Sequence, residues 1–468
     1  MEVGTTPLRW TERDREHDLH RIDRTTVTFL EFHSSDNHSV RQIRSLPDFK
    51  QTLTSLSHAP GSKPPMRLFI VEDLSREVIE ALGSRFDIDP MCFREQIDDY
   101  VWHNVRDPWA QPPSLMASTK HRNWFMLRNM RLRYHETRDD FNAAWKETNT
   151  WNVLRRPDDD ENEESGAGDE AESVVSILRT RTVVWIGKDK QCNDATVGII
   201  LADPTTTHGH PLWYDRSNFL PLPSMHAPPP TSPPPKSWSK DIANLTRTYP
   251  WFPSPTTTTT TTTTSTPSPH LLTKPLLFLL SSEWLLLIAY VKTRLSQIET
   301  GIQRPKLYYL KNDISRKRLH MWRKQVPLFR EMVTETLEHA LPAAARLTNS
   351  WQPKAANSPM DRKAIVTDLS FDDVAGYEDI IPDFKRILAA INDLQDRVDR
   401  LTDIVTAEIS IEDTKRSLIE THNSARLTWL ATIFVPLSLI RYVLDHYFTC
   451  LHGMSMKIGM GYEMMAWY

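Results

Sequence analysis

The chain has few cysteines, little net charge and no signal-peptide pattern in its first residues. Its only cysteines are Cys92, Cys192 and Cys450, which lie far apart in 468 residues. They therefore form no disulfide framework or cysteine metal motif, and they suit a reducing compartment. The formal net charge of −4 at pH 7 gives no reason to expect nucleic acid as a partner. Residues 1–6, MEVGTT, lack the basic and apolar runs of a signal peptide, so we expect the N-terminal part to be cytosolic.

Motifs of the common enzyme classes are also missing. The sequence has no Gly-rich phosphate loop, no Gly-x-Ser-x-Gly elbow, no His-Glu-x-x-His and no paired Cys-x-x-Cys. The pair His208-Gly-His210 could contribute to a metal site, but with no third ligand nearby a simple loop pair is favoured. We therefore expect no catalytic residues, no bound cofactor and no resident metal, and we do not expect an enzyme.

Apolar residues are scarce over much of the chain. They make up 39% of the sequence, and the mean hydropathy is −0.47, so we expect large exposed or disordered regions. Three polar stretches fit this description: residues 1–64, an acidic loop at 157–172, and a Pro/Thr-rich linker at 221–270 with unbroken threonine over 256–264. The linker could be an O-glycosylated extracellular stalk. Without a signal peptide, a cytosolic disordered insertion is favoured.

Residues 65–220 have the pattern of an α/β domain that the acidic loop interrupts. Apolar runs rich in β-branched residues predict strands at 67–74, 122–127, 180–187 and 196–202. After the first of these, Ser75 fits the N-cap of a helix, and Val78, Ile79 and Leu82 have helical spacing.

Two helical segments are expected after the linker. Residues 276–291 are strongly apolar, but they are fewer than the ~20 that a bilayer requires. They also carry Glu283 near the middle, which is costly in lipid. A buried helix of a soluble bundle is therefore favoured over a membrane span. Residues 306–350 predict an amphipathic helix whose apolar side is formed by Leu319, Trp322, Val326, Phe329 and Val333.

A strict heptad pattern begins at Ile380. Apolar residues alternate in steps of four and three, as in the a/d seam of a coiled coil: Ile380, Phe384, Ile387, Ile391, Leu394, Val398, Leu401 and Val405. At 1.5 Å per residue this seam is roughly 40 Å long. The helix could pack against its own chain, form a stalk that associates between subunits, or do both.

The heptad helix leads into an uncharged apolar run at 427–440. Lys415, Arg416 and Arg426 precede the run, which puts its N-terminal side in the cytosol by the positive-inside rule. The run is shorter than a full span, and Arg441 follows it directly. Composition alone leaves a membrane helix and a buried core helix equally open.

The order of residues in this run resembles that of a known family. The segment Arg426-Leu-Thr-Trp-Leu-Ala-Thr-Ile-Phe-Val-Pro-Leu-Ser-Leu-Ile440 resembles the first transmembrane helix of CorA-like divalent metal-ion transporters. Residues 284–299 are similar to a helix of fungal CorA-like proteins. The α/β domain fits as a variant of the family's cytosolic domain. The resemblance is specific over about 380–440, weaker over 271–350, and faint before that.

The resemblance implies an α+β fold class, with an N-terminal α/β cytosolic domain and a long helical stalk or coiled coil leading into a C-terminal transmembrane helix. It implies an integral membrane protein that forms a homo-oligomer, a pentamer, in a lipid bilayer. Such a channel passes Mg²⁺ or a related divalent cation. The positions that match the family's pore-lining positions are Leu427, Val435 and Ser438. The same membrane-helix motif includes Thr428, Thr432 and Pro436.

The resemblance fails after Ile440. The Gly-Met-Asn tripeptide that ends the family's first membrane helix is missing, and Gly453-Met454-Ser455 is the nearest triplet. No second clean apolar helix follows. Residues 441–443 can be encoded by AGG-TAT-GTN, which contains a common splice-donor sequence, so one hypothesis is that the tail is translated intron; the other is a divergent protein. The alternative function is a non-conducting helical scaffold or regulatory relative that has lost the pore signature.

These patterns predict six regions in chain order. They are a polar N-terminus at 1–64, the α/β domain at 65–220, the linker at 221–270, a helical bundle and stalk at 271–426, the transmembrane helix at 427–448 and a divergent tail at 449–468.

Overall fold

The fold was analysed in a computed structural model. It describes residues 21–33, 38–56, 65–97, 115–153, 155, 157–159, 173–192, 194–212, 237–248, 268–303, 312–349 and 376–463. The chain divides into two compact units, Met1–Asp399 and Arg400–Tyr468, and each is described by itself.

The first unit is built around one mixed sheet. Its strands are β1 (Thr26–Phe32), β2 (His38–Ile43), β3 (Met66–Glu72), β4 (Trp124–His135), β5 (Pro157–Asp159), β6 (Val174–Asp189), β7 (Ala195–Ala202) and β8 (His210–Pro211). The order across the sheet is β2-β1-β3-β7-β6-β4-β8, and β5 pairs with β6. Only β3 and β7 pair in parallel among the described strands; the other pairs are antiparallel.

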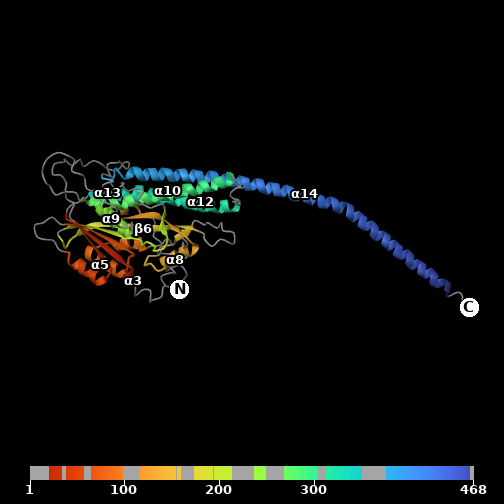
Figure 1. Ribbon diagram of the computed structural model, residues 1–468, viewed down its shortest axis with the longest axis horizontal. Helices are drawn as coiled ribbons and strands as arrows, with labels where there is room; N and C mark the ends of the chain where they lie inside the picture. The colour runs from red at the N-terminus through yellow and green to blue at the C-terminus, as the bar shows by residue number, and fades with distance from the viewer. Residues whose placement is uncertain are drawn as a thin grey trace. The chain divides into compact units, whose positions relative to one another are not determined.

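Helices cover both faces of this sheet (Figure 1). On one face, α4 (Leu46–Thr54), α5 (Arg76–Phe86) and α6 (Pro90–Ile97) share an apolar core with the strands. On the other, α9 (Trp238–Thr248) contacts β1 and β3, while α10 (Lys274–Gln303) and α12 (Asn312–Glu335) contact β4. The remaining helical elements are α3 (Arg21–Arg24), α7 (Met116–Thr119), α8 (Arg138–Thr148), η2 (Pro269–Leu272), η3 (Thr336–Ala340), α13 (Leu341–Asn349) and α14 (Ile381–Glu463).

Burial on both faces explains why the central strands read as continuous apolar runs. In β3 the three consecutive residues Phe69, Ile70 and Val71 are each 0% exposed. Phe69 and Val71 belong to the core beneath α4 and α5, and Ile70 points to the opposite face because side chains alternate along a strand. The predicted strands at 67–74, 122–127, 180–187 and 196–202 are all confirmed, as is the helix that follows Ser75.

Two strands are longer than the sequence predicted. β4 and β6 pair over twelve residues, Trp124 to His135 against Trp185 to Val174. Arginines interrupt their apolar pattern, but each arginine has an acceptor. Arg131 donates to the hydroxyl of Thr205, Arg133 to the carbonyls of His208 and Gly209, and Arg179 to the carboxylate of Asp158. These contacts allow charged residues to remain in long, largely buried strands.

The expectation that residues 1–64 are poorly ordered is wrong for 21–33 and 38–56. β1 lies between β2 and β3 and pairs with both. Its alternating sequence, TVTFLEF, has the β-branched and aromatic residues that favour a strand. The α/β domain therefore begins well before residue 65. Residues 157–159 of the expected acidic loop form β5, and 160–172 lie outside the described residues.

The expected linker at 221–270 also contains structure. Residues 238–248 form α9, whose buried Trp238, Ile242 and Leu245 have helical spacing. Its first turn is held by polar contacts, because Ser237 and Ser239 both donate to the carboxylate of Glu72. The surrounding proline runs hid this short amphipathic segment in the sequence. The threonine run at 256–264 lies outside the described residues.

The bundle after the linker matches its prediction. The apolar window of α10 is 72% buried, and Glu283 is buried within it, as expected for a core helix of a soluble domain. The five residues predicted to form the apolar side of the next helix are all buried: Leu319, Trp322, Val326, Phe329 and Val333. That helix continues through one π-helical turn, η3, into α13.

The first turns of α14 pack within the chain's first unit. The seam residues Phe384, Ile387, Ile391, Leu394 and Val398 are at most 1% exposed. Two ion pairs join α14 to α10: Lys274 Nζ lies 3.2 Å from Asp379, just before α14, and Arg397 pairs with Glu299. Lys274 near the start of α10 pairs with a residue near the start of α14, and Glu299 near the end of α10 pairs with the later Arg397. The two helices are therefore parallel. The heptad seam is thus an intrachain core over this part, whichever contacts other copies make.

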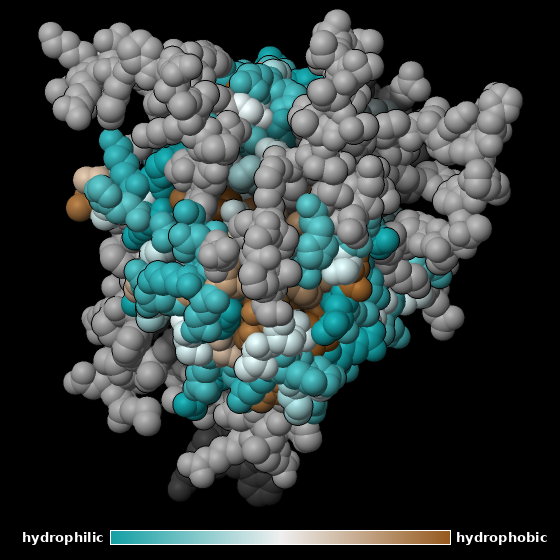
Figure 2. All heavy atoms as spheres, turned by 90° about the vertical axis from the view of Figure 1, so that its left-hand side faces the viewer, coloured by the Kyte–Doolittle hydropathy of each residue, from teal (hydrophilic) through white to brown (hydrophobic). Residues whose placement is uncertain are grey.

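On the face of the molecule shown in Figure 2, the visible described residues are mainly hydrophilic, with apolar side chains scattered among them. This is the ordinary surface of a domain that faces water.

We expect Ile391→Ala to destabilise the protein by about 2–5 kcal/mol, because Ile391 is fully buried in the seam and the change leaves a cavity. Ile404→Ala is the matched control, since Ile404 is 50% exposed on the same helix and should cost roughly 0.5 kcal/mol or less. Thermal unfolding of the full chain, followed by circular dichroism, measures both. Equal losses would argue against an intrachain seam.

Candidate membrane-spanning segment

The second unit carries an apolar run that no other described part of that unit covers. Among the described helices, two are long and apolar enough to cross a bilayer, one within α10 and one within Ile381–Cys450 of α14. Their apolar windows have similar mean hydropathy, 1.6 and 1.7, but the first is 72% buried and the second 0%. A large exposed apolar surface marks an interaction site rather than a core.

The six residues singled out from the sequence lie on successive turns of this helix. Leu427 is 67% exposed and Val435 65%. At about 100° per residue, Leu427, Val435 and Ser438 fall within an arc of about 80° and share one face. Thr428, Thr432 and Pro436 occupy the neighbouring arc. The helix therefore brings the three expected pore-lining residues together on one side.

The hydroxyl groups in this run are bonded within the helix. Thr428, Thr432 and Ser438 donate to the carbonyls of Ser424, Thr428 and Phe434 at 2.8, 2.7 and 2.7 Å. Such back-bonding lets a hydroxyl sit in an apolar environment without an unpaired donor. Pro436 lies inside the helix, where its missing N–H withdraws the usual donor from the carbonyl four residues earlier.

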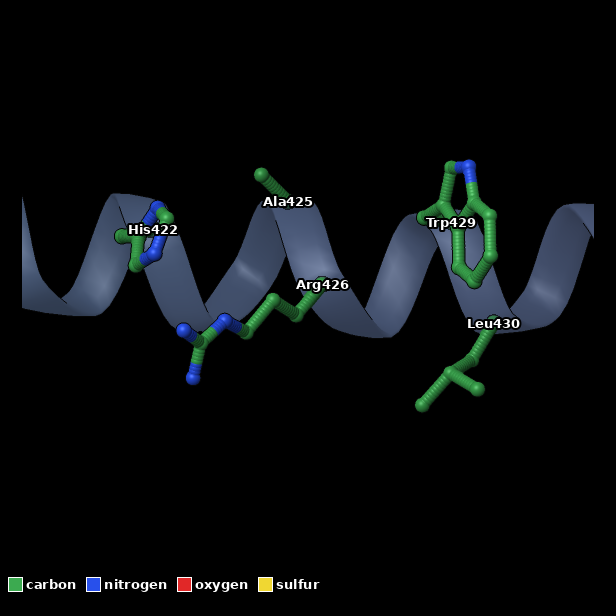
Figure 3. Close-up of a pocket in the computed structure, with 5 residues that line it drawn as sticks. All are labelled: His422, Ala425, Arg426, Trp429 and Leu430. Carbon is green, nitrogen blue, oxygen red and sulfur yellow. The ribbon is translucent and has the colours of Figure 1, made fainter.

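The N-terminal end of the run has basic and aromatic side chains. Figure 3 shows His422, Ala425, Arg426, Trp429 and Leu430 on consecutive turns of α14, with Arg426 and Leu430 pointing to one side. They border a shallow hollow of about 420 Å³ that is formed by this one helix and is no enclosed site. A basic residue followed by tryptophan is typical of the boundary between water and lipid.

The C-terminal end is interrupted by polar groups. Arg441 and Asp445 follow the uncharged run, and the rings of Tyr442 and His446 stack with centroids 6.3 Å apart. Helical backbone continues to Glu463, so the Gly453-Met454-Ser455 triplet lies within the helix and not at its end. The expected boundary between the membrane helix at 448 and a separate tail has no counterpart in the backbone.

Open α/β sheets often bind ligands at the carboxyl ends of their parallel strands. In the first unit, residues of the same chain bind the carboxylates at these strand ends. Asp73 follows β3 and accepts from the backbone amides of Asn152 and Val153 at 2.8 and 3.3 Å. Asp203 follows β7 and binds Arg155 Nε at 2.6 Å and Gln96 at 2.6 Å. Asn152, Val153 and Arg155 thus occupy these carboxylates from within the described chain.

The His208-Gly-His210 pair does not converge. His208 Nδ1 lies 3.1 Å from Asp140, whereas His210 Nε2 lies 4.0 Å from Glu136, and Gly209 between them has φ +72°. Among the described residues no group of three or more His, Cys, Asp or Glu could hold a metal ion.

The other oxygen of Asp140 binds His135 Nδ1 at 3.0 Å, and His135 Nε2 contacts Ser176 Oγ at 2.9 Å. This Ser-His-Asp arrangement could not be found by spacing in the sequence, because its members are up to 41 residues apart. Burial lowers the pKa of His135, which keeps the ring neutral near pH 7. Ser176 is only 3% exposed, so its hydroxyl cannot meet a substrate, and the chain of contacts instead ties β4, β6 and α8 together.

The three cysteines differ in exposure. Cys92 and Cys192 are buried, and Cys450 is exposed. Burial raises the pKa of the Cys92 thiol well above its usual value, which makes that thiol unreactive.

The sequence matches no family model and no curated protein. Among solved structures, the complete structure of the CorA magnesium transporter from Methanocaldococcus jannaschii is similar to this chain, with a TM-score of 0.39 and 10% sequence identity. The match covers 87% of this chain and 83% of that one.

We expect Asp73→Asn to change how stability depends on pH. Burial raises the pKa of Asp73 to about 7, against a usual value of 3.8. The folded protein therefore holds Asp73 in its protonated form more strongly than the unfolded chain does. The free energy of unfolding falls as pH rises from about 4 through about 7, because Asp73 then ionises more easily in the unfolded chain. The amide variant keeps the left-handed backbone that Asp73 adopts and does not ionise. Between pH 5 and pH 8 the variant should gain stability relative to the parent, on the order of 1–4 kcal/mol. Thermal unfolding at both pH values tests this, and parallel profiles would contradict it.

Proposed function

We propose that this chain is a subunit of a membrane transporter that passes Mg²⁺ or a related divalent cation by the CorA-like route. The first unit would lie in the cytosol, and α14 would carry the chain into the bilayer near residues 427–448. Homo-oligomers, pentamers by the family resemblance, would surround a pore. The transported ion would be the cargo, and no resident metal or cofactor is required.

The observation that carries the proposal is the exposed apolar run of α14. Its side chains have no apolar partner in the second unit, with Trp429, Phe434 and Leu439 between 61% and 67% exposed. Water is a poor solvent for such a surface, while lipid tails and neighbouring copies of the helix are good ones. The order of residues from Arg426 to Ile440, which resembles the family's first membrane helix, supports a role in ion transport.

The proposed pore uses the shared face of Leu427, Val435 and Ser438. Leu427 would form an apolar ring near the cytosolic end, where a narrow apolar pore blocks ions by excluding water. The Ser438 hydroxyl would contact the water shell of the ion, because Mg²⁺ dehydrates reluctantly. Lys415, Arg416 and Arg426 would hold the preceding end in the cytosol.

A non-conducting scaffold is the second candidate. At the position where the family has its ion-selective mouth, the Gly-Met-Asn tripeptide is missing and the charged residues Arg441 and Asp445 follow the apolar run. Both differences favour this candidate. In that case α14 would insert or associate but pass no ion.

We expect Ile433→Arg to impair membrane insertion. Ile433 lies at the middle of the uncharged run, and arginine at the centre of a membrane helix costs about 2.5–3.5 kcal/mol on insertion scales. Leu418→Arg is the matched control, since Leu418 lies on the same helix before the run. The measured quantity is the fraction of full-length protein that resists carbonate extraction from membranes. Retention of Ile433→Arg at the parent level would speak against a span here.

We expect the full chain, reconstituted in liposomes, to admit Mg²⁺ detected by a dye trapped inside. Ser438→Ala should reduce the rate several-fold, because it removes a hydroxyl from the proposed pore face. Thr432→Ala is matched: it removes a back-bonded hydroxyl of the same kind from the neighbouring arc and should change the rate by less than about two-fold. Insertion without flux would support the scaffold. Equal effects of the two variants would refute the assignment of the pore face.

A further inference from the structure

The base of α14 is fixed by one buried tyrosine. Tyr377 is 0% exposed, and so are Thr273 and Thr348. The Tyr377 hydroxyl lies 2.5 Å from Thr273 Oγ1 and 3.3 Å from Thr348 Oγ1. Thr273 immediately precedes α10 and Thr348 belongs to the last turn of α13. A single side chain therefore joins the starts of α10 and α14 to the end of α13.

His270 packs directly against this tyrosine. The two rings meet edge to face with centroids 5.2 Å apart. Gly376, before the tyrosine, has φ +95°, and a Cβ there would lie 2.4 Å from the His270 ring. The backbone thus approaches the imidazole as closely as only glycine allows. His270 therefore packs against both Gly376 and Tyr377, just before α14 begins.

His270 has no place for a second proton. Its Nδ1 atom is buried and finds no hydrogen-bond partner among the described residues, which fits the neutral tautomer with the proton on Nε2. Protonation would put an N–H at Nδ1 with no acceptor, and leaving a buried donor unpaired is costly.

The charges around His270 come from α10 and from the turn before α14. Lys274 repels a protonated ring, whereas Glu378 and Asp379 attract it. Both carboxylates already have partners: Glu378 accepts from the Gly376 amide at 2.9 Å, and Asp379 pairs with Lys274. Burial first, and then Lys274, lower the pKa of His270. Tyr377 stays uncharged, because burial raises its pKa to about 12.

We propose that His270, Gly376 and Tyr377 form a pH-sensitive latch that holds the base of α14 when His270 is neutral and releases it when His270 is protonated. A protonated ring would withdraw toward water, and Tyr377 would lose its edge-to-face partner. The amide of Ile380, just before α14, and that of Ile381, its first residue, donate to the carbonyl of Tyr377 at 3.0 and 3.1 Å. Release of Tyr377 therefore frays the start of the helix.

The direction of the response follows from the lowered pKa. A histidine that is harder to protonate in the folded junction stabilises that junction fully above its free pKa, near 6.5. This stabilisation is lost as pH falls below that value. The latch does not depend on cation transport, because every group in it lies in the first unit.

Hydrogen exchange of the full chain in detergent micelles tests the latch. The amides of Ile380, Ile381 and Phe384 should lose protection, after correction for intrinsic rates, between pH 8 and pH 5. The loss should be about ten-fold for each unit of pH below the free histidine pKa. His270→Phe keeps an aromatic edge against Tyr377 and cannot titrate, so its protection should be independent of pH. The same substitution at His320, exposed on α12, should leave the parent response intact.

A second variant tests the latch independently in case His270→Phe does not fold. Lys274→Gln removes the positive neighbour and frees Asp379, so the midpoint of the protection loss should move to higher pH. Amides of β6 and β7 serve as an internal reference for global unfolding. The proposal fails if the parent shows no local loss below pH 6.5, if His270→Phe responds like the parent, or if Lys274→Gln moves the midpoint downward. None of these outcomes bears on whether the protein carries ions.

Discussion

The organisation of this protein depends on how α14 covers its apolar side chains. Over its first turns the helix has one apolar stripe, and α10 and the bundle cover it within the same chain. From Leu427 to Ile440 apolar side chains surround the helix, so no single neighbour could cover them all. One neighbouring helix can cover a single apolar stripe, but a helix that is apolar all round must be buried in a protein core or in lipid. This change, from one apolar face to apolar residues all round, is the reason for treating the first part of α14 as core and the later part as a candidate membrane segment.

Several buried carboxylates of the sheet domain are paired within the domain. Arg67 bonds to Glu31 and Asp189, and Arg85 shares Asp189, so a buried carboxylate joins β3, β6 and α5. Asp73 likewise accepts from the amides of Asn152 and Val153, and Asp203 binds Arg155. Where many enzymes leave polar groups free at strand ends, this domain uses them for internal hydrogen bonds.

Much of the fold could be predicted because strong local patterns agreed with the final packing. The heptad residues from Ile380 to Val405 and the apolar side of α12 were both found from spacing alone. β1 and α9 were missed because polar or proline-rich neighbours diluted short apolar patterns, although both are stabilised by contacts with distant strands. The lengths of β4 and β6 were underestimated because Arg131 and Arg179 find their acceptors only in the folded chain. The membrane motif was visible as an ordered string of residues, whereas the latch joins residues more than 100 positions apart and could not be read from the sequence.

The distribution of the three cysteines has a practical consequence. Two thiols are enclosed in the sheet domain, and the third, Cys450, lies ten residues beyond the apolar run on an exposed surface. A membrane-impermeant maleimide would therefore distinguish this position from the others without any substitution. The unmodified chain carries its own reporter of topology, since labelling from one side of a sealed vesicle reveals which compartment receives the end of the helix.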